Sequence, residues 1–314
     1  MAGEQQCSRP ALWASLTLIS GLWGSSFLFV KLIDPSVPPF AFAALRGFIA
    51  MASLAAWIGC RRLLSDGGTP LRPQFGWRTF RHVAVLGTTN GWLASALTVI
   101  AVRHIASSMV AMIQAAVPLI VALLAHGIFP EERFRPGQAI GILIGVAGIL
   151  LIAGPVAVWG AAGSSIGIAA ILLTALCLAV GTVYGRHVKA ADATMLACGQ
   201  QAFGAVVACV ISCSIEPPAL WSQPLSSWLL FVPLGILCSA APTALYLRLL
   251  ARTPSTPSAL VTYLQPVWAT LLGWGVLAEQ PGPAALAGVG LVIAGIALTT
   301  APPFQTAAIV SQKV

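Results

Sequence analysis

The chain has 314 residues, of which 58% are hydrophobic and only 8% are charged, and its mean hydropathy is +0.91. A soluble domain carries about 25% charged residues, because water must wet its surface. So few charges exclude a soluble globular domain and predict an all-α integral membrane protein. The net charge of +8 does not indicate a nucleic-acid partner, because the basic residues cluster in short segments beside apolar runs.

Ten apolar stretches are each long enough to cross the bilayer as a helix, since about 20 apolar residues span about 30 Å of hydrocarbon. The expected helices cover 11–31, 39–60, 80–101, 106–126, 136–154, 164–186, 194–215, 228–250, 257–277 and 282–300. With a cytoplasmic N-terminus, thirteen of the sixteen Lys and Arg residues fall inside the cell, and only Lys31 and Arg103 fall outside. The positive-inside rule therefore predicts that the tails 1–10 and 301–314 are both cytoplasmic.

The second half of the chain repeats the first. At an offset of 148 residues, Ser107, Ala111, Pro118, Leu123, Leu124 and Gly127 match Ser255, Ala259, Pro266, Leu271, Leu272 and Gly275. Each repeat, 11–155 and 160–300, holds five expected spans, and an odd number makes the second repeat enter the membrane inverted. We therefore expect ten transmembrane helices as two inverted five-helix repeats, an architecture typical of transporters that open to one side at a time.

Several motifs recur in both repeats in the same order. The first repeat contains "WGSSFLFVK", "FAALR" and "SSMVAMIQAAVPLIVALLAHGIFPEE", and the second contains "VGTVYGR" and "SALVTYLQPVWATLLGWGVLAEQ". Over residues 11–300 the chain resembles the EamA family of the drug/metabolite transporter superfamily. The resemblance implies a multi-pass exporter in the inner, cytoplasmic membrane that moves amino acids, related amphipathic metabolites or drug-like compounds. A nucleotide-sugar or triose-phosphate-like carrier of the same superfamily is the near alternative.

Two prolines fall near the centres of expected spans, at equivalent places in the repeats. Pro118 and Pro266 remove the backbone bonds that the carbonyls of Gln114 and Thr262 would accept. Unpaired carbonyls are costly in lipid, so this backbone should face protein or a watery cavity. Gln114, Thr262 and Gln265 bring polar side chains to the same level. We expect helix kinks at both prolines and a substrate pathway beside them, with ordinary helix packing as the alternative.

Other candidates for the substrate pathway are polar or aromatic residues inside the expected spans: Trp23, Ser26, Asn90, Trp92, Gln200, Ser239, Thr243 and Tyr246. Ser239, Thr243 and Tyr246 share one helical face, at positions i, i+4 and i+7. Aromatic walls with a few placed polar groups suit amphipathic metabolites. A packing role is the alternative for each of these residues.

Arg46 is the one basic residue that falls well inside an expected span. Such an arginine costs about 2.5–3.5 kcal/mol to insert, so it is normally paired, hydrated or functional. Three interpretations remain open: it reaches the outer headgroups, braces helix ends by bonding carbonyls, or binds a carboxylate or phosphate of the substrate. Gln200 and Gln201 hold the corresponding place in the second repeat, so the charge is not symmetric.

None of the eight Asp and Glu residues falls inside an expected span, which argues against a carboxylate relay for protons. The seven cysteines form no CxxC pair and show no metal-ligand spacing. We therefore expect no cofactor and no metal, and a small-molecule substrate and membrane lipids as partners, with the chain a monomer or a homodimer. We do not expect an enzyme, which would need a nucleophile or metal cluster. A membrane-embedded enzyme and a passive channel stay alternatives of a different class.

The last spans of both repeats are rich in glycine. Gly137, Gly141, Gly145 and Gly148 are spaced along 136–154, and Gly288, Gly290 and Gly295 along 282–300. Small residues at such spacing let two helices approach closely within a membrane. We expect these faces to pack inside the protein, with a dimer interface as the alternative.

Overall fold

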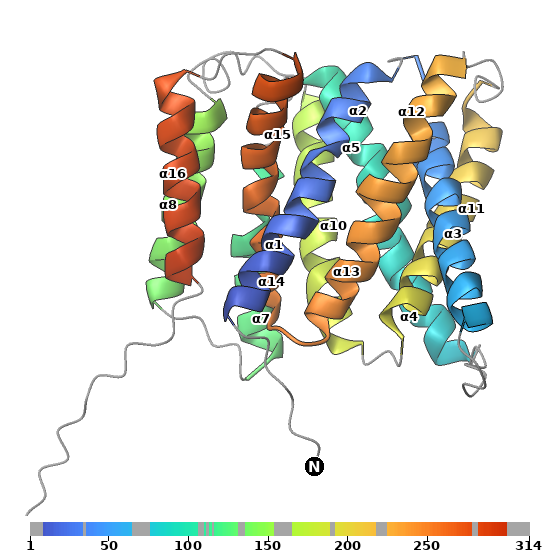
Figure 1. Cartoon of the computed structure of the whole chain (residues 1–314), viewed down its shortest axis with the longest axis horizontal. Helices are drawn as coiled ribbons and strands as arrows, with labels where there is room; N and C mark the ends of the chain where they lie inside the picture. Colours follow the sequence, from blue (N-terminus) through green and yellow to red (C-terminus); the bar gives the residue numbers. More distant parts are fainter. Residues whose placement is uncertain are drawn as a thin grey trace, which may run out of the picture.

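A computed structural model describes residues 9–33, 36–64, 76–105, 110, 113–114, 116–130, 136–153, 165–188, 192–217, 225–277 and 282–299, and within these ranges all regular structure is helical (Figure 1). The first half contains α1 (Arg9–Gly24), α2 (Ser26–Leu32), α3 (Pro39–Leu64), α4 (Trp77–Gly87), η1 (Thr88–Trp92), α5 (Leu93–His104), α7 (Val117–Ile128) and α8 (Pro136–Ala153). The second contains α10 (Ser165–His187), α11 (Ala193–Ile215), α12 (Leu225–Gly235), η3 (Ile236–Ala240), α13 (Ala241–Leu250), α14 (Ser255–Ala259), α15 (Val261–Leu277) and α16 (Pro283–Thr299).

Length and composition make five of the described helical elements able to cross a membrane. They are Pro39–Leu64, Trp77–His104, Ser165–His187, Ala193–Ile215 and Leu225–Leu250. Shorter apolar helices cover Val117–Ile128, Pro136–Leu151 and Leu286–Thr299. Large aliphatic side chains lie on the outside of the bundle, such as Leu143 and Val210, each 61% exposed. An all-helical bundle with an apolar exterior is an integral membrane protein that crosses the bilayer several times.

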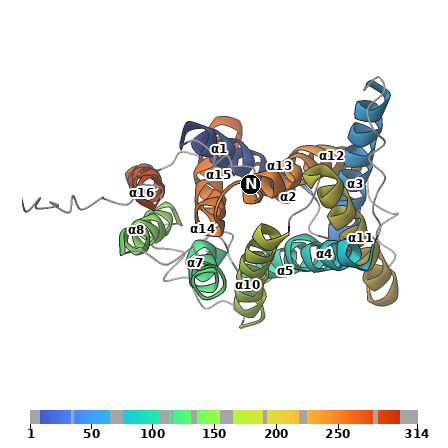
Figure 2. The ribbon, with the colours of Figure 1, turned by 90° about the horizontal axis from the view of Figure 1, so that it is seen from below.

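The helices of the two sequence repeats interleave and do not form two separate bundles. Helix α1 packs against α15 and α13 of the second repeat, and α10 packs against α5 and α7 of the first. Corresponding helices also pair across the repeats, α3 with α11 and α8 with α16. Figure 2 shows the α8–α16 pair at one edge of the bundle and the α3–α11 pair at the opposite edge.

The first helices of the two repeats run in opposite directions. Gly167, near the start of α10, packs against His104 at the end of α5, whereas Gly185, near the end of α10, packs against Leu250 at the end of α13. Leu12, near the start of α1, lies in the same buried cluster as Leu250. We call the end of the bundle where α1 begins and α13 ends the lower end, as Figure 1 draws it, and the other the upper end.

The glycines of α8 and α16 let these helices approach to backbone contact. A Cβ atom at Gly141 would lie 2.7 Å from the carbonyl oxygen of Gly295, and one at Gly148 would lie 2.6 Å from that of Gly288. At Gly145 the ring of Tyr263 occupies the space that a side chain would need. These glycines therefore pack internally, as expected, while Gly137 and Gly290 meet no atom of the described residues within 4 Å.

Helical breaks interrupt several of the expected spans within the described residues. The first span breaks at Ser25, between α1 and α2. The third and eighth spans each contain one π-helical turn, η1 and η3, which are 148 residues apart, the spacing of the sequence repeat. The ninth span has a turn at Leu260, between α14 and α15. These breaks deform the helices near the middle of the bundle, where the candidate site lies.

Pro118 was expected near the centre of a helix, but the structure places it at the start of one. It is the second residue of α7, so it begins a helix and does not kink the centre of one. A proline suits the first turn because the amide that it lacks has no intrahelical partner there. Pro266 does lie inside a helix, as the sixth residue of α15.

Candidate functional site

An interior cavity of about 170 Å³ lies between helices from both repeats. Eleven of the twelve residues that the sequence suggested for the substrate pathway line it: Trp23, Ser26, Arg46, Asn90, Trp92, Gln114, Gln200, Thr243, Tyr246, Thr262 and Gln265. Apolar side chains such as Phe42, Val99 and Leu178 complete the wall. The structure thus brings these residues together, and their role in transport stays a prediction.

Ser239 is the candidate that does not line the cavity; it binds Arg46 instead. The guanidinium Nε of Arg46 donates to Ser239 Oγ, and its Nη2 donates to the carbonyl oxygen of Cys238 at 3.0 Å. Ser239 Oγ in turn donates to the carbonyl oxygen of Leu234 at 2.9 Å. Arg46 therefore points inward to η3, which contradicts the interpretation that it reaches the outer headgroups and agrees with carbonyl bonding.

The cavity wall holds polar atoms without a hydrogen-bond partner among the described residues. They are Asn90 Oδ1, Trp92 Nε1 and Gln200 Oε1. Gln200 is only 2% exposed. A buried polar atom left unpaired costs about 1–3 kcal/mol. Three residues of the cavity wall therefore carry a buried polar atom that is left unpaired at an energetic cost.

Hydrogen-bonded and aromatic side chains form the lower boundary of the cavity. Tyr246 Oη lies 2.9 Å from Thr182 Oγ1, which joins α13 to α10. The ring of Trp23 packs edge-on against that of Tyr246, with centroids 5.1 Å apart. Gln201 Nε2 donates to Thr243 Oγ1 at 3.2 Å.

Thr182 and Gln201 also line the cavity, although neither was among the residues expected in the substrate pathway. Two signals pointed toward them. Thr182 belongs to the repeated motif "VGTVYGR", and Gln201 follows the selected Gln200.

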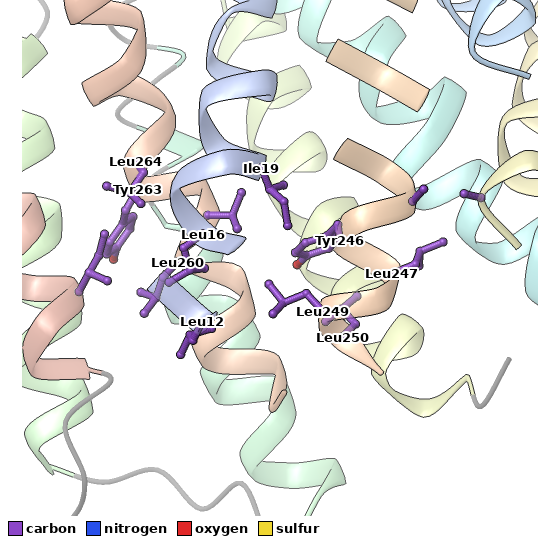
Figure 3. Packing of buried hydrophobic residues seen from close by; sticks show 14 of the residues in the cluster. Leu12, Leu16, Ile19, Tyr246, Leu247, Leu249, Leu250, Leu260, Tyr263 and Leu264 are labelled. Carbon is purple, nitrogen blue, oxygen red and sulfur yellow. The ribbon is translucent and has the colours of Figure 1, made fainter. Parts of the chain in front are cut away.

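A buried apolar cluster, which we call the lower cluster, lies beside and below Tyr246. Its labelled members in Figure 3 come from α1, α13 and the α14–α15 region: Leu12, Leu16, Ile19, Tyr246, Leu247, Leu249, Leu250, Leu260, Tyr263 and Leu264. Leu12, Leu249 and Leu250 lie below Tyr246 in this view, whereas Tyr263 and Leu264 lie above it. Tyr263 is fully buried, and its Oη donates to the carbonyl oxygen of Ile142 in α8 at 3.1 Å. The cavity extends the other way, as far as Val102 near the end of α5. It is therefore blocked toward the lower end of the bundle.

The charge on the described wall of this cavity is positive. Arg46 is the only charged residue among the described residues that line it. The two carboxylates of the described chain act at helix ends: Asp192 caps α11, and Glu216 accepts the amides of Phe40 and Ala41 at the start of α3. In the same part of the chain, no three His, Cys, Asp or Glu residues are grouped as metal ligands. The site can attract an anionic group through Arg46, and apolar or aromatic groups can pack against the remaining wall.

The chain is similar to known proteins along most of its length. A model of the EamA-like transporter family matches residues 11–154 and again residues 165–301. An "uncharacterized transporter" of Archaeoglobus fulgidus is 25% identical over 303 residues, 95% of this chain and 99% of that protein. The "uncharacterized inner membrane transporter YedA" of Escherichia coli K12 is 26% identical over 292 residues, 92% of this chain and 90% of the relative.

A solved crystal structure also matches, with a TM-score of 0.76 at 23% identity, over 93% of this chain and 97% of the other. This likeness shows a shared fold. The two family-model matches together cover nearly the whole chain. The protein is therefore a membrane transporter of the EamA-like transporter family.

Proposed function

We propose that this protein is a secondary transporter that exports small amphipathic carboxylates, such as amino acids, across the cytoplasmic membrane by alternating access. The observation that carries the proposal is the cavity, which Arg46 lines together with apolar side chains and with Asn90, Trp92 and Gln200, each of which has an unpaired polar atom. Binding sites for small molecules are largely apolar, with a few polar groups that fix orientation.

The size of the cavity favours small solutes. Its volume of about 170 Å³ is close to the roughly 150 Å³ of an engineered cavity that binds benzene. Drug-sized ligands use pockets of about 300–1,000 Å³. A nucleotide sugar would also bring two phosphates, for which one described cation is a poor match. The cavity therefore supports an amino-acid-sized substrate over the nucleotide-sugar alternative.

Features of both repeats support alternating access between two inverted five-span halves. The family model matches twice, and the π-helical turns lie at equivalent positions in the two halves. The first helices of the halves run in opposite directions, and several corresponding helices pack against each other. Inverted repeats let one set of contacts close where its counterpart opens. With both termini cytoplasmic, the lower cluster would close the cytoplasmic side, and the cavity would face outward.

Counterflow in liposomes tests this proposal. Purified protein is reconstituted, the liposomes are loaded with an unlabelled amino acid, and uptake of labelled amino acids and of uncharged solutes of similar size is measured. We expect saturable uptake of carboxylated solutes that the internal solute stimulates. In Arg46→Gln this uptake should fall at least about tenfold, because removing one partner of a desolvated charged contact costs several kcal/mol.

The matched control is Arg248→Gln, which removes a different arginine. Arg248 donates to Thr194 Oγ1 at 2.7 Å and does not line the cavity, so carboxylate selectivity should be unchanged. Absence of flux for every solute would contradict the transporter proposal, and unsaturable flux without counterflow would indicate a channel. Equal loss of carboxylated and uncharged solutes in Arg46→Gln would assign Arg46 to folding.

A further inference from the structure

The two π-helical turns have different partners, although they are 148 residues apart and so correspond in the two repeats. At η3, Arg46 of α3 donates to Ser239 Oγ and to the carbonyl oxygen of Cys238. At η1, the residue that corresponds to Cys238 is Asn90, whose Oδ1 has no partner among the described residues. Among the described residues, an arginine is hydrogen-bonded to η3, whereas Asn90 Oδ1 of η1 is left unpaired.

The sequence explains why a carbonyl is available at η3. Pro242 is the second residue of α13 and lies four residues after Cys238. Because proline has no backbone N–H, it cannot give the Cys238 carbonyl its usual i→i−4 bond. Arg46 Nη2 takes that place at 3.0 Å. The corresponding residue in the first repeat is Ala94, which has a backbone N–H.

The contacts also determine which edge of the guanidinium is used. An arginine has five N–H donors in a rigid planar fork. The Nε and Nη2 donors that bind η3 lie along one edge of that fork. The donors at the end of the fork, on Nη1 and Nη2, remain, and Arg46 lines the cavity. That end matches the two oxygens of a carboxylate.

We propose that η3 is a positioning site for Arg46, which presents the end of its guanidinium to a substrate carboxylate. Ser239 and the Cys238 carbonyl hold the side edge, and Pro242 keeps that carbonyl free. Leu234 fixes the hydroxyl of Ser239, because its carbonyl oxygen accepts the Ser239 proton at 2.9 Å. These residues act through Arg46 and do not touch the substrate. The inference deepens the proposed function, since it assigns the determinants of carboxylate selectivity.

Binding of benzoate and of benzamide to the purified full-length protein tests the inference. The two probes have nearly the same shape, and only benzoate is charged, so the ratio of their Kd values measures how well Arg46 is presented. We expect wild type to prefer benzoate. Ser239→Ala should reduce that preference about tenfold, the effect of losing about one charged hydrogen bond. Ser239→Thr should restore it, because threonine keeps the hydroxyl.

Pro242→Ala gives a test that separates positioning from stability. Alanine restores the N–H that pairs with the Cys238 carbonyl, so helix α13 should be no less stable. Arg46 then shares that acceptor with the restored N–H, which weakens its bond to the carbonyl, and benzoate preference should fall severalfold while benzamide binding is unchanged. A merely structural role for these residues would not change the ratio of the two affinities.

Matched controls use the same residue types elsewhere. Ser53 lies on α3 with Arg46 and donates to Ala50 within that helix at 2.9 Å, and Pro233 lies inside α12. Ser53→Ala and Pro233→Ala should keep the wild-type preference.

The inference is overturned if wild type binds both probes equally, or if Ser239→Ala and Pro242→Ala keep the wild-type ratio. Preference for benzoate without any counterflow would contradict the transporter proposal alone and leave the positioning role standing.

Discussion

The cavity and the lower cluster are adjacent regions built from the same helices, and they differ in polarity. Helix α1 contributes Trp23 to the cavity and Leu16 to the lower cluster; α13 contributes Thr243 to the cavity and Leu250 to the cluster. Tyr246 belongs to both regions. The change from polar to apolar side chains along one helix therefore marks where the interior becomes closed to solutes.

The two regions also differ in what they contribute to stability. In the lower cluster, fully buried side chains such as Leu16 and Tyr263 gain close packing, and a cavity left by truncation is costly. In the cavity wall, unpartnered atoms such as Gln200 Oε1 each cost about 1–3 kcal/mol. Substitutions in the lower cluster should therefore lower stability, whereas substitutions in the cavity should lower function with little effect on stability.

Tyr263→Ala should produce the largest effect. Tyr263 is among the largest fully buried side chains, and it links α15 to α8 through the carbonyl of Ile142. Truncating a buried aromatic residue costs about 3–5 kcal/mol. We expect a large fall in the thermal unfolding temperature of the detergent-solubilised protein, measured by intrinsic fluorescence.

Tyr263→Phe is the control for this substitution, because it keeps the ring and removes only the hydroxyl. Its cost should be about 0.5–1.5 kcal/mol, the value of one net hydrogen bond. An unfolding temperature of Tyr263→Ala equal to that of Tyr263→Phe would show that the ring contributes no packing energy to the lower cluster.

Gln200→Leu should lower transport without lowering stability, the opposite of what is expected for Tyr263→Ala. The substitution removes an unpartnered acceptor from a residue that is 2% exposed and replaces it with an apolar group of similar size. Stability should stay the same or rise by about 1 kcal/mol, while counterflow of solutes that carry an N–H or O–H donor should fall. The measurements are thermal unfolding and counterflow on the same preparation. Lower stability with unchanged transport would place Gln200 in the packing core.

Composition and the repeat predicted the helical membrane fold and most of the cavity wall from local information. Polar side chains inside apolar spans are expensive, so residues such as Gln114, Thr243 and Gln265 could be identified as inward-facing before their neighbours were known. The structure places all three on one cavity. The inverted ten-span arrangement itself remains a prediction from the odd number of spans in each repeat.

The helical breaks could not be predicted, because they depend on contacts between distant segments. The turns η1 and η3 have the sequences TTNGW and ILCSA, which share no residue at any position. Ser239 looked like a wall residue from its helical face, yet its hydroxyl binds Arg46, which lies 193 residues earlier. Pro118 was expected at a helix centre because an apolar run of suitable length surrounds it. The run does not reveal that helix α7 begins at Val117.

Tyr246→Phe should cause a small loss of stability, and it tests the boundary between the two regions. The substitution keeps the ring packed on Trp23 and removes the hydroxyl that meets Thr182 Oγ1 at 2.9 Å. We expect a loss of about 0.5–1.5 kcal/mol in unfolding free energy. Thr182→Val removes the same bond from the other side, so the double variant should be less destabilised than the sum of the two single variants. Additive effects would mean that the two hydroxyls act independently. In that case α10 and α13 would be joined at the cavity floor by ring packing alone, and Tyr246 would belong energetically to the lower cluster.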